Sequence, residues 1–345
     1  MGSAVTVLPF GETLEVEPGE SVLKAILRQG RFVKYGCKHG GCSTCRAEVV
    51  QGDYELSDNT SFSLSDADRA AGVVLLCSTF IQADELVVDV SRTMDDLSED
   101  QYLAGQHVQD YTATVDRIEA LTHDIRWLGL RLEDPAGFTF AAGQYVEVAV
   151  PGMTDSWRSF SMANPPGEAG RVDLIVKVIP GGTFSAALDT AVRPGDQMRL
   201  RGPFGQFGVR LSHRPMIMLA GGSGMAPVLA MLKDLATTPN RRDVIFFYGA
   251  RTRSDLFLVE ELRDLALAHA WLTFVPALSE PAAGGDWDGE TGLITEVLAW
   301  HLPSAKGMEA YLCGPPPMID AAVDLLKSAG CKERHIFFDR FVPSG

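Results

Sequence analysis

The chain has 345 residues, enough for two or three domains, and its 46% apolar and 22% charged residues are ordinary for a globular protein. Its net charge of −15 argues against a nucleic-acid partner, because such a surface repels phosphate. Six cysteines are too few for a disulfide scaffold, and four of them crowd one region, which indicates metal binding in a reducing cytoplasm. The uncharged stretch 215–232 contains a Gly-rich turn and Pro227, so we expect strand, turn and helix there rather than a membrane span.

Residues 1–97 are predicted to form a small α+β domain. Short strands are expected at residues 4–10, 13–16 and 86–90, and a helix at residues 21–29. The helix has Ser21 as its N-cap and Gly30 as its stop. The domain has 15 acidic and 8 basic residues, which suits docking onto a basic patch of another protein. A polar, acidic segment, residues 98–109, is the expected linker.

Cysteines in this first domain are spaced like the ligands of an iron–sulfur cluster. Cys37, Cys42 and Cys45 follow the pattern C-x4-C-x2-C, and Cys77 stands alone further along the chain. This spacing matches the plant-type 2Fe–2S arrangement, and the loop glycines permit the positive φ angles that a tight wrap requires. Zinc also binds four cysteines, but structural zinc sites usually pair two C-x2-C knuckles. A Rieske ligand set would need a Cys-x-x-His pair that the sequence lacks, so we predict a 2Fe–2S cluster.

The rest of the chain divides into two stretches that differ in their predicted secondary structure. Residues 110–211 are rich in β-prone runs separated by Gly and Pro turns, which predicts an antiparallel barrel. These runs are 111–118, 125–132, 144–150, 172–179 and 197–201. Residues 212–345 alternate short apolar strands with helices, which predicts a parallel, Rossmann-like α/β sheet. The strands are expected at 216–220, 244–248, 272–276, 310–313 and 335–338, and the clearest helix at 318–329.

Two motifs follow strands of the predicted barrel. Arg158-Ser159-Phe160-Ser161 comes after the run that ends at Val150, and Gly182-Thr183-Phe184-Ser185 comes after the run that ends at Ile179. An arginine after a strand can neutralise a phosphate, and a Gly-Gly turn before a helix offers free N–H groups to a pyrophosphate. An aromatic side chain between them can lie against a flat ring. Each motif alone is more often an ordinary surface arginine or hairpin turn.

Glycine-rich turns also end two strands of the predicted parallel sheet. Gly221-Gly222-Ser223-Gly224 lies between a strand and a helix, where backbone N–H groups can bind a nucleotide phosphate. It is not the G-x-G-x-x-G of ordinary dinucleotide folds. Cys313-Gly314-Pro315 ends a later strand. Its thiol is either part of a site or a buried core thiol, which is the common fate of a free cysteine.

The order of these motifs resembles the ferredoxin–NADP reductase superfamily, over residues 110–345. The resemblance implies a Greek-key antiparallel barrel that binds FAD and an α/β domain that binds a nicotinamide nucleotide. Its flavin signature is Arg-x-Tyr/Phe-Ser, which implies that Phe160 lies against the isoalloxazine ring and Ser161 near its N5. The implied flavin contacts are Arg158, Ser159, Phe160, Ser161, Lys177, Val178, Gly182, Thr183, Phe184 and Ser185. Many relatives have Tyr in place of Phe160, so stacking is retained here but the phenol's hydrogen bond is lost.

The same resemblance assigns the nicotinamide side. It implies that Cys313 lies beside the nicotinamide and that Asp339, where many relatives have Glu, lies near the flavin. The implied catalytic residues are Ser161, Cys313 and Asp339. The implied nucleotide contacts are Gly221, Gly222, Ser223, Gly224, Arg251, Cys313, Gly314, Pro315 and, at the tail, Phe341. Arg251 and Arg253 could bind the 2′-phosphate of NADPH, but similar Gly-Ala-Arg-Thr segments occur in NADH-using relatives, so we expect NADH.

Over almost its whole length the chain resembles the reductase components of bacterial multicomponent oxygenases. Residues 285–289 and 341–345 look most similar to the soluble methane, propane and alkene monooxygenase group, whose reductases serve diiron hydroxylases. The resemblance implies a monomeric NADH oxidoreductase with a β-grasp ferredoxin domain, FAD and a 2Fe–2S cluster, which delivers electrons to a hydroxylase without a membrane partner. Two alternatives stay open: a reductase for a Rieske aromatic-ring dioxygenase, and a regulatory iron–sulfur flavoprotein without turnover.

Overall fold

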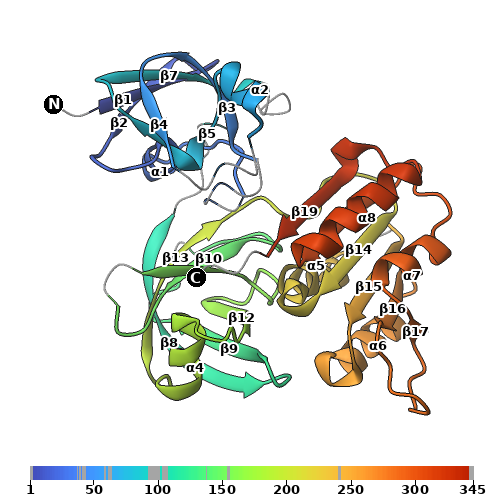
Figure 1. Cartoon of the computed structure of the whole chain (residues 1–345). Coiled ribbons are helices and arrows are strands. Elements are labelled where there is room, and N and C mark those ends of the chain that lie inside the picture. Colours follow the sequence, from blue (N-terminus) through green and yellow to red (C-terminus); the bar gives the residue numbers. More distant parts are fainter. Residues whose placement is uncertain are drawn as a thin grey trace. The chain divides into compact units, whose positions relative to one another are not determined.

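The computed structural model describes most of the chain and divides it into two compact units. The described residues are 3–36, 38, 40, 44–57, 60, 64–91, 102, 108–136, 138–153, 156–239 and 242–341. The first unit comprises Met1–Gln109 with Pro203–Gln206, and the second comprises Asp110–Gly202 with Phe207–Gly345. Figure 1 shows the elements of both. Within the described residues, no helix has the length and apolar character needed to cross a membrane.

The first unit is a five-stranded sheet in the order β2-β1-β7-β3-β5, with a small β4-β6 pair. Its strands are β1 (Ser3–Leu8), β2 (Glu12–Val16), β3 (Arg46–Gln51), β4 (Tyr54–Leu56), β5 (Val73–Leu75), β6 (Thr79–Ile81) and β7 (Glu85–Asp89). Its helices are α1 (Val22–Arg28), α2 (Asp66–Ala70) and the 3-10 turn η2 (Leu76–Ser78). The first and last strands, β1 and β7, pair in parallel, whereas the other pairs of the five-stranded sheet are antiparallel. The predicted β-grasp domain is confirmed.

Local signals set the ends of α1. The Ser21 side chain accepts a hydrogen bond from the Lys24 N–H at 3.4 Å, as an N-cap does, and Gly30 has a φ of +70° just beyond the helix. The buried face of α1 covers the sheet. The predicted helix at residues 21–29 is therefore confirmed.

Tyr102 belongs to the predicted linker yet packs on the first unit. Its ring stacks on Phe10 with centroids 3.9 Å apart, and its carbonyl accepts a hydrogen bond from the Phe32 N–H at 2.9 Å. Residues 98–101 and 103–107 of the predicted linker lie outside the described residues.

The second unit begins with a six-stranded sheet in the order β11-β10-β13-β8-β9-β12. Its elements are β8 (Gln109–Ala120), β9 (Ile125–Leu132), β10 (Tyr145–Ala149), β11 (Trp157–Ser161), β12 (Arg171–Lys177), α4 (Thr183–Thr190) and β13 (Gln197–Phe204). A bridge between Met162, directly after β11, and Leu174, in the middle of β12, links the two edge strands, so the sheet curls toward a barrel. The predicted antiparallel barrel is confirmed. Sequence analysis did not predict β11, whose residues carry the Arg-Ser-Phe-Ser motif.

The rest of the second unit is a parallel sheet in the order β17-β16-β15-β14-β18-β19. Its strands are β14 (Met216–Gly221), β15 (Val244–Ala250), β16 (Leu272–Leu278), β17 (Glu290–Thr291), β18 (Glu309–Gly314) and β19 (Ile336–Arg340). Its helices are α5 (Met225–Thr237), α6 (Val259–Ala268), α7 (Ile294–His301) and α8 (Pro316–Ser328). Strand order reverses between β14 and β18, and ligands of such sheets bind beyond the carboxyl ends of the strands at that point.

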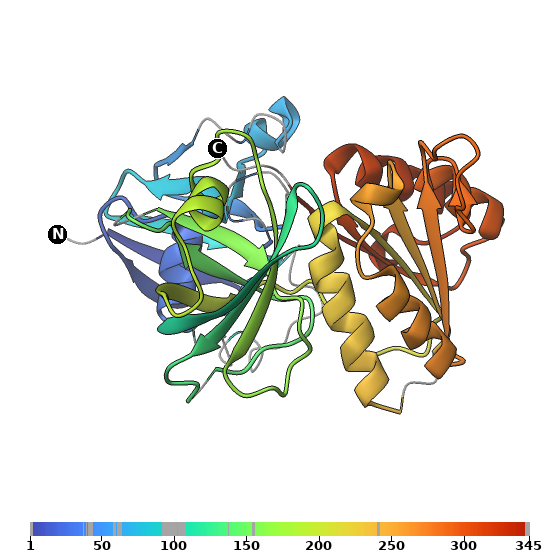
Figure 2. The same cartoon turned by 90° about the horizontal axis from the view of Figure 1, so that it is seen from below.

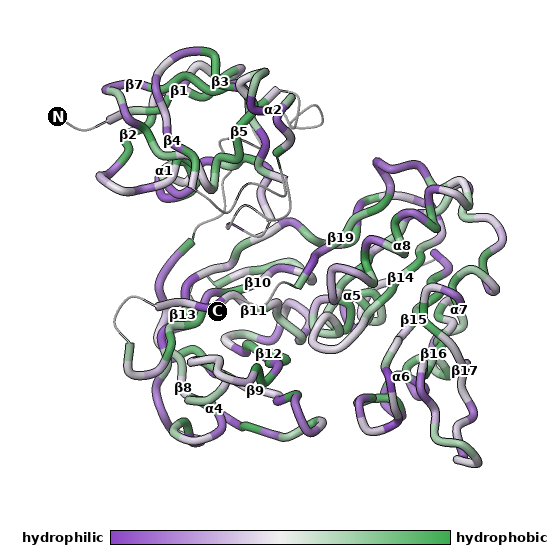
Figure 3. The backbone as a smooth tube through the Cα atoms, viewed as in Figure 1, coloured by the Kyte–Doolittle hydropathy of each residue, from purple (hydrophilic) through white to green (hydrophobic). Residues whose placement is uncertain are grey.

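Helices cover both faces of this sheet. One apolar core contains α5 and part of α6, and the other contains α7 and α8. Hydrophobic residues run along β14 and β15 (Figure 3), as expected for strands buried on both faces. Figure 2 shows α5 between the parallel sheet and the barrel. The predicted α/β domain is confirmed, and the predicted helix at residues 318–329 is α8.

Candidate functional site

Two of the four predicted cluster ligands are described, and they lie next to one another. Cys45 precedes β3 and Cys77 lies in η2, and the Cys45 carbonyl accepts a hydrogen bond from the Leu76 N–H at 2.9 Å. Both thiols are buried and neither is in a disulfide. Gly40 in the same loop has a φ of +85°. This donor set fits a cluster, whereas Cys37 and Cys42 lie outside the described residues.

The Arg-Ser-Phe-Ser motif occupies β11, one edge of the barrel sheet. Phe160 pairs with Val146 and Arg158 with Val148, so these two side chains share one face of the strand. The Arg158 guanidinium donates hydrogen bonds to the Ser156 hydroxyl and the Trp157 carbonyl. Ser159, on the opposite face, is exposed.

The barrel folds the Gly-Gly turn against this strand. The Phe160 and Phe184 rings have centroids 4.7 Å apart, which brings the two flavin motifs together. Ser161 is buried, and its hydroxyl has no hydrogen-bond partner within the described residues, so it can serve a bound ring.

The start of α4 has the features of a phosphate site. Gly182 is its N-cap residue, no side chain caps the first turn, and Thr183 is exposed. A Cβ on Gly182 would lie 2.9 Å from the Ser185 Oγ. The Ser185 hydroxyl accepts a hydrogen bond from the Ile179 N–H at 3.1 Å, so it stiffens the turn. Uncapped N–H groups at a helix start fit a pyrophosphate, and these residues therefore fit FAD.

Lys177 is the last residue of β12 and Val178 follows it, beside a second turn of the barrel. The Lys177 ammonium lies 3.4 Å from the Asp124 carboxylate, and the Val178 N–H donates to the Asp124 carbonyl at 2.7 Å. Both predicted residues are therefore held by Asp124, which sequence analysis did not single out.

Parallel pairing brings the nicotinamide-side motifs to one edge of the sheet. β18 pairs with β14 so that Cys313 lies beside Ala220, and with β19 so that Cys313 lies beside Asp339. The backbone N–H of Phe341 donates to the Gly314 carbonyl at 2.9 Å, which holds the tail at the same edge. The last residues of the predicted tail, 342–345, lie outside the described residues.

The two glycine-rich turns contact one another at this edge. A Cβ on Gly224 would lie 2.4 Å from the Cys313 carbonyl oxygen, and one on Gly314 would lie 3.1 Å from the Gly221 carbonyl oxygen. Gly222 adopts a φ of +57°, and no side chain caps the turn at Gly222–Gly224 or α5 after it. Glycine is required for this approach and leaves N–H groups available to a nucleotide phosphate. Ser223, half-buried, and Pro315, exposed, flank the contact.

Cys313 is fully buried. Its burial, reinforced by the nearby Asp339 carboxylate, raises the pKa of the Cys313 thiol well above the usual value. The side chain therefore remains a neutral thiol at physiological pH. It can shape the edge of the sheet by contact, but it is not a thiolate nucleophile.

Arg251 follows β15 at the same edge and has an exposed side chain. Its carbonyl accepts a hydrogen bond from the Glu280 N–H at 2.8 Å. The Arg253 guanidinium lies 5.4 Å from the centre of the Trp287 ring.

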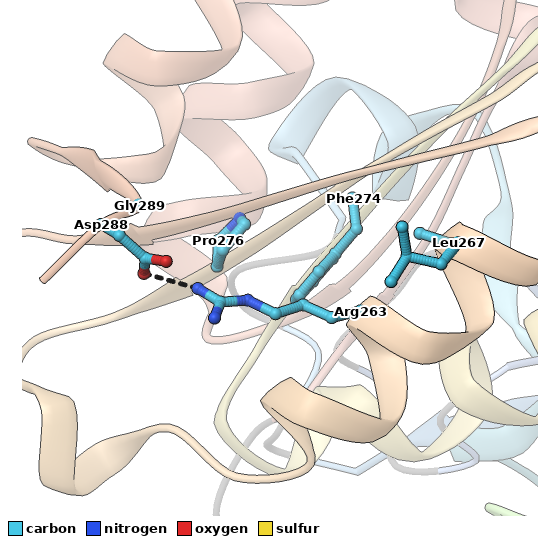
Figure 4. Close-up of a pocket in the computed structure, with 7 residues that line it drawn as sticks. Arg263, Leu267, Phe274, Pro276, Asp288 and Gly289 are labelled. Atoms are coloured by element: carbon cyan, nitrogen blue, oxygen red, sulfur yellow. Dashed lines mark hydrogen bonds and ion pairs between the residues drawn. The ribbon is translucent and has the colours of Figure 1, made fainter.

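A surface pocket of about 480 Å³ lies elsewhere on the parallel-sheet domain (Figure 4). It is lined by Arg263, Ala266, Leu267, Phe274, Pro276, Asp288 and Gly289. Arg263 and Asp288 form an ion pair of 2.5 Å at its rim. None of the lining residues belongs to a predicted cofactor motif, so this pocket is not the redox site.

Sequence analysis did not identify the buried carboxylates, of which Glu309 lies in the parallel sheet. Glu309 begins β18 and pairs with Arg242 at 2.6 Å. A glutamate at the start of an otherwise apolar strand was the available signal, since buried carboxylates are normally paired.

Three family models match the chain in succession. They are the "2Fe-2S iron-sulfur cluster binding domain" over residues 5–82, the "Oxidoreductase FAD-binding domain" over residues 112–208 and the "Oxidoreductase NAD-binding domain" over residues 218–324. The predicted cofactors, 2Fe–2S, FAD and NADH, are therefore confirmed.

Known proteins match over nearly the full chain. The propane 2-monooxygenase reductase component of Rhodococcus jostii is 40% identical over 96% of this chain and 90% of its own length. The phenol 2-monooxygenase reductase component of Pseudomonas sp. (strain CF600) is 38% identical over 99% of this chain and 95% of its own. The crystal structure of an Amycolatopsis cytochrome P450 reductase is 31% identical with a TM-score of 0.86, and covers 99% of both chains. The chain belongs to the reductase components of multicomponent monooxygenases, which are NADH oxidoreductases that carry FAD and a 2Fe–2S cluster.

Proposed function

We propose that this chain oxidises NADH and delivers single electrons, through the cluster of its first unit, to the hydroxylase component of a multicomponent monooxygenase. The observation that carries the proposal is the row Ala220, Cys313 and Asp339 across three parallel strands, within the same compact unit as the Arg-Ser-Phe-Ser strand. When bound, FAD supplies the conversion of a two-electron hydride into the one-electron transfers that a 2Fe–2S cluster accepts.

The chain's own residues bind and orient rather than exchange protons. Arg158 and the uncapped start of α4 bind the flavin pyrophosphate, and the Ser161 hydroxyl donates to the ring. The glycine turn at 221–224 binds the nucleotide phosphate, while Cys313 and Asp339 shape the place where the nicotinamide lies. Hydride transfer needs no strong acid or base, and the neutral Cys313 thiol suits this role.

The partner we propose is a diiron hydroxylase, served by a monomeric reductase. Support comes from the identities of 36–40% to propane and phenol monooxygenase reductase components. A second candidate, an aromatic-ring dioxygenase, is supported by the ferredoxin reductase of a carbazole 1,9a-dioxygenase, at 27% identity and a TM-score of 0.76. The higher identities favour the monooxygenase. They also favour turnover over a purely regulatory flavoprotein.

The test separates the two electron-transfer stages. Cys42→Ser should abolish electron delivery to the cognate hydroxylase and leave flavin reduction by NADH within about twofold, because the cluster and the flavin are held by different parts of the chain. Stopped-flow spectroscopy measures both. The matched control is Cys331→Ser, a buried thiol that donates to the Met308 carbonyl in the core, which should change neither stage. Loss of flavin reduction in a folded Cys42→Ser protein would contradict the proposal, and so would delivery that survives the substitution.

A further inference from the structure

A buried hydrogen-bond network lies at the start of β18, away from the redox edge of the sheet. The Glu309 carboxylate accepts hydrogen bonds from the Arg242 guanidinium at 2.6 Å and from the Tyr311 hydroxyl at 2.9 Å. Burial acts to raise the pKa of Glu309, but hydrogen bonds from Ser212, Tyr311 and Arg242 outweigh it and hold that pKa below its usual value. Glu309 is therefore ionised and fully engaged at neutral pH.

This network binds the segment that joins the barrel to the parallel sheet. The Tyr311 hydroxyl accepts a hydrogen bond from the Arg210 N–H at 3.0 Å, while Arg242 donates to the Arg210 carbonyl at 2.8 Å and to the Arg214 carbonyl at 2.7 Å. Both backbone polar groups of Arg210 are thus held by side chains of the sheet. In addition, the Arg210 guanidinium lies 5.1 Å from the centre of the Phe337 ring.

The same segment packs against the barrel on its other side. A Cβ on Gly143 would lie 2.0 Å from the Phe207 carbonyl oxygen, so the barrel turn and the segment are in direct backbone contact. The Phe207 and Tyr311 rings have centroids 6.5 Å apart. Residues 207–210 therefore contact the flavin barrel on one side and β18 on the other.

Tyr311 also lies on the strand that carries Cys313. The two residues are two positions apart and so face the same side of the sheet. The Tyr311 ring stacks on Phe337, its partner in β19, with centroids 5.2 Å apart, and Cys313 pairs with Asp339 two residues further along the same strands. One side chain thus connects the barrel segment, the buried charge pair and the two strands of the nicotinamide edge.

We propose that Tyr311 is a positioning residue for hydride transfer: its hydroxyl, held by Glu309, fixes the segment 207–210 and thereby the barrel relative to the edge at Cys313 and Asp339. Hydride transfer depends steeply on the separation and alignment of the reacting atoms, so a small loosening slows it without weakening nucleotide binding. The inference rests on the NADH oxidoreductase activity of the chain and adds a residue outside the cofactor motifs.

Tyr311→Phe tests the proposal, because it removes the hydroxyl and retains the ring. Anaerobic stopped-flow reduction of the bound flavin by NADH should show a limiting rate lower by about tenfold. The apparent dissociation constant for NADH should stay within twofold, and the FAD content should be unchanged. An unaltered limiting rate, or a loss confined to NADH affinity, would overturn the proposal.

The matched control is Tyr248→Phe. Tyr248 is another buried tyrosine of the same sheet, and its hydroxyl also accepts a backbone N–H bond, from Phe257 at 3.3 Å. It has no hydrogen bond to the segment 207–210 within the described residues. We expect Tyr248→Phe to lower the melting temperature about as much as Tyr311→Phe does and to leave the limiting rate of flavin reduction unchanged. Equal slowing in both variants would reduce Tyr311 to a purely structural residue.

An isotope measurement identifies the step that slows. With NADH deuterated at the transferred position, Tyr311→Phe should keep a primary isotope effect on the limiting rate at least as large as that of the unmodified protein. Disappearance of the isotope effect would place the slow step elsewhere and contradict the role. Failure of the unmodified protein to reduce its flavin with NADH would instead refute the proposed function, so the two outcomes are distinguishable.

Discussion

Burial determines the chemistry that a cysteine can perform in this chain. Cys313 lies at the carboxyl end of β18 among apolar neighbours and beside Asp339, and both factors favour its neutral form. Sequence reasoning left Cys313 open between a site residue and a core thiol. The thiol is buried in the core, and its backbone carbonyl lies against Gly224 at the glycine-rich turn, while its role beside the nicotinamide stays a prediction.

Cys313→Ala should slow hydride transfer by about tenfold and leave FAD bound, because the thiol shapes the nicotinamide side and contacts no flavin phosphate. Stopped-flow reduction by NADH, with flavin content measured by absorbance, tests this. Cys331→Ala is the control, since Cys331 belongs to the apolar core on the other face of the sheet. Equal rates for Cys313→Ala and the unmodified protein would return Cys313 to a purely structural role.

At the scale of elements, the sequence predicted what local signals determine. The helix α1 follows from its capping residues, and the barrel strands β9 and β12 follow from β-prone runs bounded by Gly and Pro turns. The short strands β3 to β6 were missed because three to six residues hold too little pattern, and their partners are far along the chain. β11 was missed because three of its five residues are polar, and its ladder with β10 alone defines it.

The contact between the two glycine-rich turns was also beyond sequence reasoning. It depends on the register that pairs Ala220 with Cys313, which only the assembled sheet establishes. Each motif was identified correctly as a turn after a strand, but nothing local indicates that Gly224 packs on the Cys313 carbonyl.

Gly224→Ala should therefore destabilise the protein by about 1–3 kcal/mol through overpacking and should weaken NADH binding. The new methyl group would meet the Cys313 carbonyl oxygen at 2.4 Å. Thermal unfolding and an NADH titration measure the two effects. Gly222→Ala serves for comparison: it has open space but a φ of +57°, so only backbone strain of about 1 kcal/mol is expected. Equal destabilisation in both variants would mean that the contact is unimportant.

At the scale of the whole molecule, an excess of acidic side chains lies in the domain that carries the predicted cluster ligands. Residues 1–97 have 15 acidic and 8 basic side chains, and this part of the chain carries the predicted cluster ligands. The order of the three domains was readable from motifs alone. The role of Tyr102 was not, because its docking on Phe10 depends on a contact between residues far apart in the sequence.

Electron delivery to the hydroxylase should slow as ionic strength rises, whereas flavin reduction by NADH should change much less. Complementary charge accelerates encounter, and salt screens it over about 8–10 Å near physiological ionic strength. Mixing the reduced protein with its cognate hydroxylase across a salt series measures the rate. Delivery that is indifferent to salt would contradict docking through the acidic domain.

The chain also joins the two cofactor carriers covalently. From Tyr102, which docks on the first unit, to Gln109, where β8 begins, covalent geometry limits the span to about 25 Å in any conformation. A carrier on so short a tether meets its donor at an effective concentration on the order of millimolar or more. Dilution therefore slows the encounter with a separate hydroxylase but leaves the internal transfer from flavin to cluster at full speed.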